Sequence, residues 1–495
     1  MMPPRAAKNP GARAASLVAA AVATLLGGCA VGPDYVAPKT NLVPFHNAQA
    51  VTARETHTPP PALDRWWLGF NDPELTALIQ RALEQNLDLA AAVARVQQAR
   101  AVVLSARSAL LPSADATATA QVERQSRENQ FGSLETTIPG FNPYEKEFIV
   151  GATANWEVDV FGGLRRQLGA ARNELEAASA SHAVTRITVA ADVADAYLQV
   201  RGFQARIAVA ENQVDTDAQL LHLVEVRYRL GQSDAREVAQ ANALLKQARA
   251  SVPDLRINLE AELNRLDVLL GAQPGTYAQE LVAPAEIPEI PAISASDPPV
   301  DILRRRPDVI AAERQLAASS ERIGAALADY YPKISLSGVL GFDSQSISHL
   351  FDSRAFQPIG TGTVSWRLFD FGRVNAEVKQ ARGANAEALA VYRQTLLTAA
   401  EDVENALIGL SQTEIHAVET QAEVDALTRA RDLSEKAYKA GAITLTDVLN
   451  ANQQLLTARD DLYVNRANAA RAAVRTFRSL GGGWEPASQL SAASY

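Results

Sequence analysis

Few residues of this chain have the types and spacing that catalysis or metal binding requires. The six histidines show no spacing typical of metal ligands; they lie at positions 46, 57, 182, 222, 349 and 416. We find no Ser-His-Asp elbow, P-loop or glycine-rich phosphate cradle. Methionine occurs only at positions 1 and 2, so the rest of the chain has no thioether for relaying copper or silver. The sequence therefore predicts neither an enzymatic activity nor a cofactor.

The charged residues argue against nucleic acid as a partner. The formal net charge is −9 over 495 residues, and the only basic cluster is Arg304 to Arg306. A nucleic-acid interface needs a much larger local excess of Lys and Arg. Three adjacent arginines could instead bind a phosphate or a lipid headgroup. We favour the alternative that they pair with acidic groups near Asp301 and Asp308.

The single cysteine indicates a lipid anchor. Three cations precede the apolar run SLVAAAVATLLGG, which is the order found in a signal peptide. The run is shorter than the ~20 residues that span a bilayer. It ends at Leu26-Gly27-Gly28-Cys29, which resembles a bacterial lipobox, where the cysteine becomes the first mature residue and carries lipid. We predict a removed signal peptide at 1–28 and a lipidated, extended segment at 29–70. The alternative is an ordinary secretory signal in which Cys29 is incidental.

The remainder of the chain contains one structural unit twice. Residues 87–112 parallel 307–332 at an offset of 220, and residues 156–249 parallel 366–459 at an offset of 210. The difference of ten residues falls in the predicted loop of the first hairpin. A duplicated unit predicts two similar substructures. The predicted organisation is a first repeat at 71–270, a Pro-rich equatorial linker at 271–300, a second repeat at 301–482 and a tail at 483–495.

Each repeat contains two stretches that alternate polar and apolar residues with the period of a β-strand. They lie at 113–122 and 151–160 in the first repeat, and at 334–343 and 361–370 in the second. A barrel wall with lipid on one side and water on the other requires this alternation. The side chains expected to face lipid include Ala154, Trp156, Val158, Val364, Trp366 and Leu368.

Two long helices follow the predicted hairpins. The sequence is typical of a helix over 164–230 and again over 373–440. Gly231 and Gly441 then end these stretches, as a glycine in the left-handed conformation commonly does. At 1.5 Å per residue each long helix would measure roughly 100 Å. A shorter return helix follows each turn, with a kink or break expected at Pro253.

Four strands cannot close a barrel, and lipid does not tolerate an open sheet edge, so several chains must contribute. Three chains would give twelve strands. We predict a mainly α fold with an internal two-fold repeat: a long α-helical barrel of coiled-coil-like hairpins, plus four β-strands per chain that form one third of a transmembrane β-barrel. The alternative is a solid coiled-coil lipoprotein, which would show sustained Leu, Ile and Val heptads rather than this many Ala and polar residues.

The sequence resembles the TolC-type outer-membrane efflux channels, in the lipoprotein (OprM/NodT-like) branch. The resemblance rests on CAVGPDYVAP (29–38), RRPDVIAAERQLAASSERIGAALADYYPKISLSG (305–338), SWRLFDFGR (365–373) and YKAGAITLTDVLNA (438–451). It implies a homotrimer in the outer membrane of a Gram-negative bacterium, extending into the periplasm. The implied partners are outer-membrane lipid, a periplasmic adaptor protein and an inner-membrane pump of the proton-driven RND type. The implied function is the exit duct for small toxic compounds; the alternative is the duct of a type I protein-secretion system.

The resemblance also assigns roles to residues around the two turns, which would form the periplasmic mouth. Asp447 matches an acid that projects into the pore constriction, and Asn450 stands where many members have a second acid. For Asp447 the alternative is a solvated residue on the helix surface. Tyr438 is a candidate gate link to Glu237, with Tyr228 as its counterpart in the first repeat; both tyrosines could instead be packing aromatics. The turns expected to contact the adaptor contain Leu230, Gly231, Ala440 and Gly441.

Overall fold

The computed structural model describes residues 30–39, 42–49, 60–130, 133–293 and 298–485. Cys29 lies outside this range. The chain separates into two compact units. The first contains the residues up to Pro38 together with Gln97–Ala177 and Glu313–Val391, and the second contains Lys39–Val96, Ala178–Ala312 and the residues from Tyr392 onward. We describe each unit separately.

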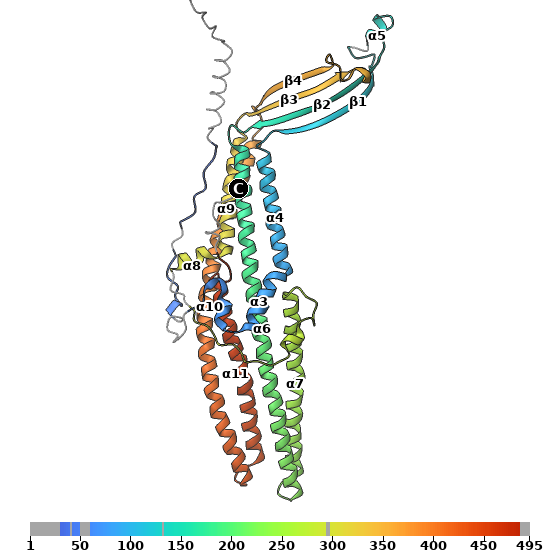
Figure 1. Ribbon diagram of the computed structural model, residues 1–495. Coiled ribbons are helices and arrows are strands. Elements are labelled where there is room, and N and C mark those ends of the chain that lie inside the picture. Colours follow the sequence, from blue (N-terminus) through green and yellow to red (C-terminus); the bar gives the residue numbers. More distant parts are fainter. Residues whose placement is uncertain (1–29, 40–41, 50–59, 131–132, 294–297, 486–495) are drawn as a thin grey trace, which may run out of the picture. The chain divides into compact units, whose positions relative to one another are not determined.

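Helices dominate the described residues, and the strands form a single sheet (Figure 1). None of the helices described is both long enough and apolar enough to cross a membrane. The elements in chain order are η1 (Leu63–Phe70), α3 (Pro73–Gln85), α4 (Leu87–Ser108), β1 (Ser113–Arg124), α5 (Leu134–Thr137), β2 (Tyr144–Val158), α6 (Gly163–Arg229), α7 (Ala235–Leu269), η2 (Ala278–Leu281), α8 (Pro299–Arg305), α9 (Pro307–Ala328), β3 (Lys333–Ser344), η3 (Ile347–His349), β4 (Phe356–Ser365), α10 (Arg373–Lys439) and α11 (Leu445–Ser479).

The internal repeat predicted from the sequence is confirmed by matched element lengths. Helices α4 and α9 each have 22 residues, α6 and α10 each have 67, and α7 and α11 each have 35. One side-chain contact is also duplicated. The indole Nε1 of Trp156 donates to the carbonyl of Leu110 at 3.0 Å, and that of Trp366 donates to the carbonyl of Tyr330 at 3.0 Å. The two copies therefore share their local architecture as well as their sequence.

The sheet of the first unit is antiparallel, with the strands in the order β1-β2-β3-β4 (Figure 1). The two predicted hairpins are confirmed, and β2 joins the repeats by pairing with β3, where Trp156 lies opposite Leu336. Strand β2 begins at Tyr144, earlier than the predicted residue 151. Within the described residues β1 and β4 pair on one side only. Every residue of these two strands is exposed.

The strand predicted at 361–370 is wrong at its C-terminal end. Strand β4 ends at Ser365, so Trp366 and Leu368, expected to face lipid from the strand, follow it. Strand β4 has no partner beyond Ser365, because Ser365 pairs with Lys333, the first residue of β3. The Asp370 carboxylate then accepts hydrogen bonds from two amides at the start of α10, at 2.9 and 2.8 Å. This cap begins α10 at Arg373, the residue at which the long helix was predicted to start.

One buried arginine holds the N-terminal segment of the first unit. The side chain of Arg166 is 8% exposed and lies at the start of α6. Its guanidinium donates hydrogen bonds to the Val31 carbonyl at 3.2 Å, the Gly32 carbonyl at 3.1 Å, the Asp34 carboxylate at 3.0 Å and the Glu321 carboxylate at 3.1 Å. The segment that begins at residue 30 is therefore attached to the helices beside the sheet.

Helix α7 continues through Pro253, so the predicted break does not occur. Proline removes one N–H from the hydrogen-bond ladder of a helix, which weakens the helix without always ending it. Ala248 and Leu255, on either side of the proline, are both buried. Packing on both sides therefore holds the helix together across the missing hydrogen bond.

Candidate functional site

The two helix-ending turns have the same backbone geometry. Gly231 has φ of 71° and Gly441 has φ of 75°, in the left-handed region that suits glycine. In the first turn the amide of Gln232 donates to the Arg227 carbonyl at 2.8 Å, and in the second the amide of Ala442 donates to the Ala437 carbonyl at 2.9 Å. These bonds from the second residue past the helix end are those of a Schellman motif. The prediction that both glycines end their helices is confirmed.

The tips of the turns are open to solvent. The predicted adaptor-contact residues Leu230, Gly231, Ala440 and Gly441 are all exposed, and Leu230 retains 66% of its accessible surface. A Cβ built on either glycine would meet no atom within 4 Å. Glycine is therefore required here by the backbone conformation and not by crowding.

Asp447 lies on the first turn of α11 and is exposed, as is Asn450. The Asp447 carboxylate accepts hydrogen bonds from the Thr444 amide at 3.0 Å and from the Thr444 hydroxyl at 2.7 Å. These two donors, the hydroxyl first, lower the pKa of the carboxyl below its ordinary value. Asp447 therefore presents a fixed negative charge at the turn, and the same hydrogen bonds cap the helix.

Tyr438 is buried between the two turns, with 2% of its surface exposed. Its hydroxyl lies 3.5 Å from Glu237 Oε2, which is a long hydrogen bond. Glu237 is the acceptor that the family resemblance predicted. Burial raises the pKa of the Tyr438 hydroxyl, and the Glu237 carboxylate adds to this rise. The tyrosine is therefore a neutral donor at physiological pH. Glu237 also accepts a hydrogen bond from Ser233 at 2.5 Å.

Arg227 makes the closer contacts to Tyr438. Its Nη1 donates to the Tyr438 carbonyl at 2.9 Å, and its guanidinium carbon lies 4.4 Å from the centroid of the tyrosine ring. A cation over an aromatic face is attracted by the ring quadrupole, more strongly where water is excluded. Arg227 was not among the residues predicted from the sequence. A comparison of the two repeats could have singled it out, because Arg227 has an uncharged counterpart, Ala437, in the second copy.

An apolar cluster surrounds Tyr438 and joins the ends of the two helical hairpins. Tyr228, the counterpart of Tyr438 in the first copy, is 49% exposed and lies outside this cluster. The structure thus brings Tyr438 and Glu237 together but not Tyr228. The buried members of the cluster are Leu220, Val224, Ala241, Tyr438, Leu445 and Val448.

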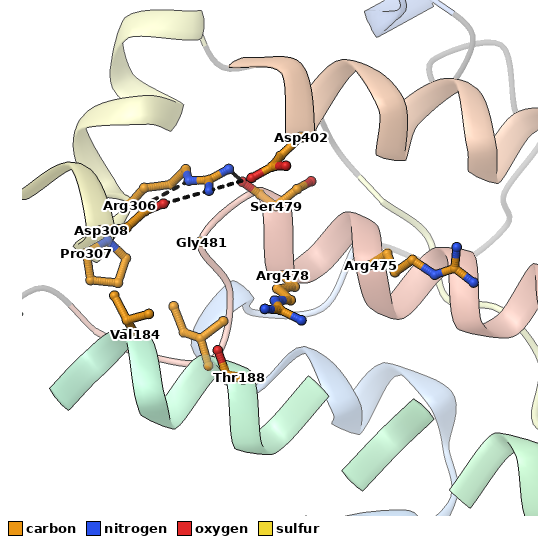
Figure 2. Close-up of a pocket in the computed structure, with 11 residues that line it drawn as sticks. Val184, Thr188, Arg306, Pro307, Asp308, Asp402, Arg475, Arg478, Ser479 and Gly481 are labelled. Carbon is orange, nitrogen blue, oxygen red and sulfur yellow. Dashed lines mark hydrogen bonds and ion pairs between the residues drawn. The ribbon is translucent and has the colours of Figure 1, made fainter. Parts of the chain in front are cut away.

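In the basic cluster Arg304 to Arg306, the side chain of Arg306 uses all of its hydrogen-bond donors. Arg306 is 8% exposed, and Figure 2 shows it extending between Asp308 and Asp402. Its five N–H groups donate to Asp308 Oδ1 (3.1 Å) and Oδ2 (2.7 Å), to Asp402 Oδ2 (2.9 Å), and to the carbonyls of Ala399 (3.1 Å) and Ser479 (3.2 Å). A guanidinium has five N–H donors, so none remains for a ligand. Pairing with Asp308 is confirmed for this arginine, while Asp402 as second acid was not foreseen.

Metal chemistry has no obvious location in the region that the structure describes. No group of three or more His, Cys, Asp or Glu side chains there could hold a metal ion. The features that remain are structural: two matched turns, a buried link between them and a four-stranded sheet.

Long helical hairpins with tight terminal turns and one β-hairpin per repeat define the class of TolC-type outer-membrane channels. The structure is similar to that of the outer-membrane channel OprN, with a TM-score of 0.84, 32% sequence identity and coverage of 92% of this chain and 100% of that one. The sequence matches the profile of the Outer membrane efflux protein family over residues 78–272 and 299–482. The chain belongs to this family and is an outer-membrane efflux channel.

Named relatives agree with this assignment. The chain is 33% identical to the pyoverdine export outer membrane protein OpmQ of Pseudomonas aeruginosa, over 85% of this chain and 88% of that protein. It is 29% identical to the toluene efflux pump outer membrane protein TtgF of Pseudomonas putida, over 94% of this chain and 96% of that protein. The resemblance to the OprM/NodT-like branch is confirmed.

Proposed function

We propose that this channel is the exit duct of a tripartite efflux system for small toxic compounds. Three copies would form a twelve-stranded barrel and a helical tunnel. A periplasmic adaptor would contact the exposed turns, and an inner-membrane pump of the RND type would supply the substrate. The observation that carries this proposal is the repeated hairpin with a linked pair of turns at its end, on a chain of the outer-membrane efflux family.

The sheet supports assembly with further copies of the chain. Strands β1 and β4 each have an exposed edge within the described residues, and lipid tolerates no unpaired backbone amide or carbonyl. Strand β4 of one copy would pair with β1 of the next. Repeating this contact three times would leave no edge unpaired, which is the arrangement that a transmembrane β-barrel needs.

Lipidation of Cys29 is part of the same proposal. The lipobox-like sequence supplies the modification site, and Arg166 attaches the segment that begins one residue later. That segment also donates from the Val31 amide to the Phe161 carbonyl at 3.1 Å, close to the end of β2. The segment that follows the lipobox-like sequence is therefore held near the end of β2, where the surface of the membrane is expected.

Conductance and drug susceptibility test the duct function together. Purified protein should give stepwise ion conductance in planar bilayers, and deletion of the gene should raise susceptibility to small toxic compounds. If both effects are absent, the protein is a structural lipoprotein and the proposal fails. If deletion instead stops export of a protein while susceptibility is unchanged, the type I secretion alternative is correct.

The contacts of Tyr438 predict different effects for two variants at the turns. Arg227→Ala removes a charge-assisted hydrogen bond and a cation–π contact, together worth about 2 kcal/mol, so it should raise the open fraction of the channel by more than tenfold. Tyr438→Phe removes only the long 3.5 Å bond and should change the open fraction by about twofold. Single-channel recording measures both. The control is Arg229→Ala, an exposed arginine on the same turn of α6; equal effects of all three variants would contradict a specific link.

The fixed charge of Asp447 predicts an effect on ion selectivity. Three such carboxylates around a three-fold axis would concentrate cations at the constriction. Asp447→Ala should weaken block by a trivalent cation by about tenfold, as measured by conductance in planar bilayers. Asp461→Ala, an exposed acid farther along α11, serves as the control. An unchanged block in Asp447→Ala would leave this residue with its helix-capping role alone.

A further inference from the structure

A polar cavity lies among the helices of the second unit, apart from the turns. Its volume is about 370 Å³, which is large enough for a small organic molecule. Residues of α6, α7 and α11 line it. The apolar part of the lining includes Leu244 and Leu456, and its charged part is Arg206, Asp217, Asp254 and Asp460.

Asp217 is the unusual member of this lining. It lies on α6 and is only 1% exposed. Its Oδ1 accepts a hydrogen bond from Gln213 Nε2 at 2.8 Å, while its Oδ2 is buried and has no hydrogen-bond partner within the described residues. A buried carboxylate oxygen without a donor is costly, and proteins usually satisfy such atoms. The cavity beside Asp217 is the available place for a donor.

Among the described residues, no cation is paired with Asp217. The arginine in the cavity lining, Arg206, is engaged by Asp460, with contacts of 2.7 and 2.9 Å. Helix α7 contributes a further acid to the lining, Asp254, and no basic residue. The charged groups from α6, α7 and α11 thus leave the cavity with an excess of negative charge. Burial raises the pKa of Asp217 to about 6, so the carboxyl is still mostly ionised at neutral pH.

We propose that this cavity binds an organic ammonium ion, with an N–H donor directed at Asp217 Oδ2 and the hydrocarbon part against the apolar lining. A metal ion fits less well, because it needs several converging oxygen ligands and no such group of acids exists among the described residues. An ammonium ion needs only one buried carboxylate and nearby polar atoms. This site is separate from the turns and does not depend on the proposed export function.

Thermal unfolding of the full-length protein in detergent tests the site, with benzylammonium chloride as the probe. A ligand that binds only the folded state raises the unfolding temperature. We expect benzylammonium at about 10 mM to raise the unfolding temperature of the wild type near pH 7.5, and the rise to disappear near pH 5, where Asp217 is protonated. Asp217→Asn should reduce the rise in unfolding temperature caused by benzylammonium at least tenfold. The exposed control Asp461→Asn should retain this rise.

Three comparisons decide the outcome. Benzyl alcohol has nearly the same shape without the charge, and potassium chloride supplies the charge without the hydrocarbon. Equal stabilisation by benzyl alcohol would mean apolar filling of the cavity, and equal stabilisation by potassium chloride would mean an inorganic cation; each overturns the proposal. Stabilisation retained in Asp217→Asn, or none in the wild type, also overturns it. If Asp217→Asn does not fold, the pH dependence of the wild type decides.

Discussion

Replacing Arg306 by alanine should lower the free energy of unfolding by about 2–4 kcal/mol, because removal of the buried guanidinium leaves several hydrogen-bond acceptors without a donor. The side chain is 8% exposed and uses all five of its N–H donors. Its partners come from the start of α9, from α10 and from the end of α11. Removal leaves the Ala399 and Ser479 carbonyls without these donors and Asp308 and Asp402 without their cation. Thermal unfolding of detergent-purified protein measures the loss.

Two variants separate the geometry of this contact from its charge. Arg306→Lys keeps the positive charge but offers three donors in place of the planar fork, so it should recover only part of the lost stability. Arg304→Ala removes an exposed neighbouring cation and should change the free energy of unfolding by less than about 0.5 kcal/mol. If Arg306→Ala is as mild as Arg304→Ala, the five hydrogen bonds do not stabilise the fold.

Replacing Asp217 by asparagine should, in contrast to Arg306→Ala, raise the free energy of unfolding, by up to about 3 kcal/mol at neutral pH. Burial raises the pKa of this carboxyl from its ordinary 3.8 to about 6. One unit of pKa shift corresponds to about 1.36 kcal/mol, so this rise makes ionisation of the buried carboxyl cost up to about 3 kcal/mol. Asparagine has nearly the same shape, retains an oxygen to accept from Gln213, and carries no charge.

The pH dependence identifies the cause of this gain. Because the folded pKa lies above the ordinary one, the folded state binds more protons than the unfolded state between about pH 4 and pH 6. The free energy of unfolding should therefore fall as the pH rises through this window. The destabilisation caused by the ionised Asp217 should be complete above about pH 6. The gain from Asp217→Asn should disappear near pH 4. An equal gain at both pH values would show that charge burial is not its source.

Asp254→Asn is the matched control for this measurement. Asp254 lines the same cavity from α7 but is exposed, so water already solvates its charge. Its replacement should change the free energy of unfolding by less than about 0.5 kcal/mol at any pH. A gain in this variant similar to that of Asp217→Asn would indicate a general effect of negative charge around the cavity.

The sequence by itself predicted the features that depend on local rules. The positions of Gly231 and Gly441 follow from the left-handed conformation that ends a helix, and both were placed correctly. The duplication was visible as two constant offsets, and the matched lengths of α6 and α10 confirm it. The hairpins followed from alternation with period two. At the end of β4 this signal failed, because its partner strand β3 begins at Lys333 and leaves the residues after Ser365 without a strand to pair with.

Only the tertiary structure decided which side chains are buried and what they contact. Both faces of α6 carry Ala and polar residues, so its sequence could not show that Asp217 is buried while Asp215, two residues earlier, is exposed. The partner of Arg306 at Asp402 lies 96 positions away. Arg227 meets Tyr438 across 211 positions. Helix ends and strand periods are set by backbone conformations of neighbouring residues, whereas charge burial and long-range pairing depend on how separate helices pack.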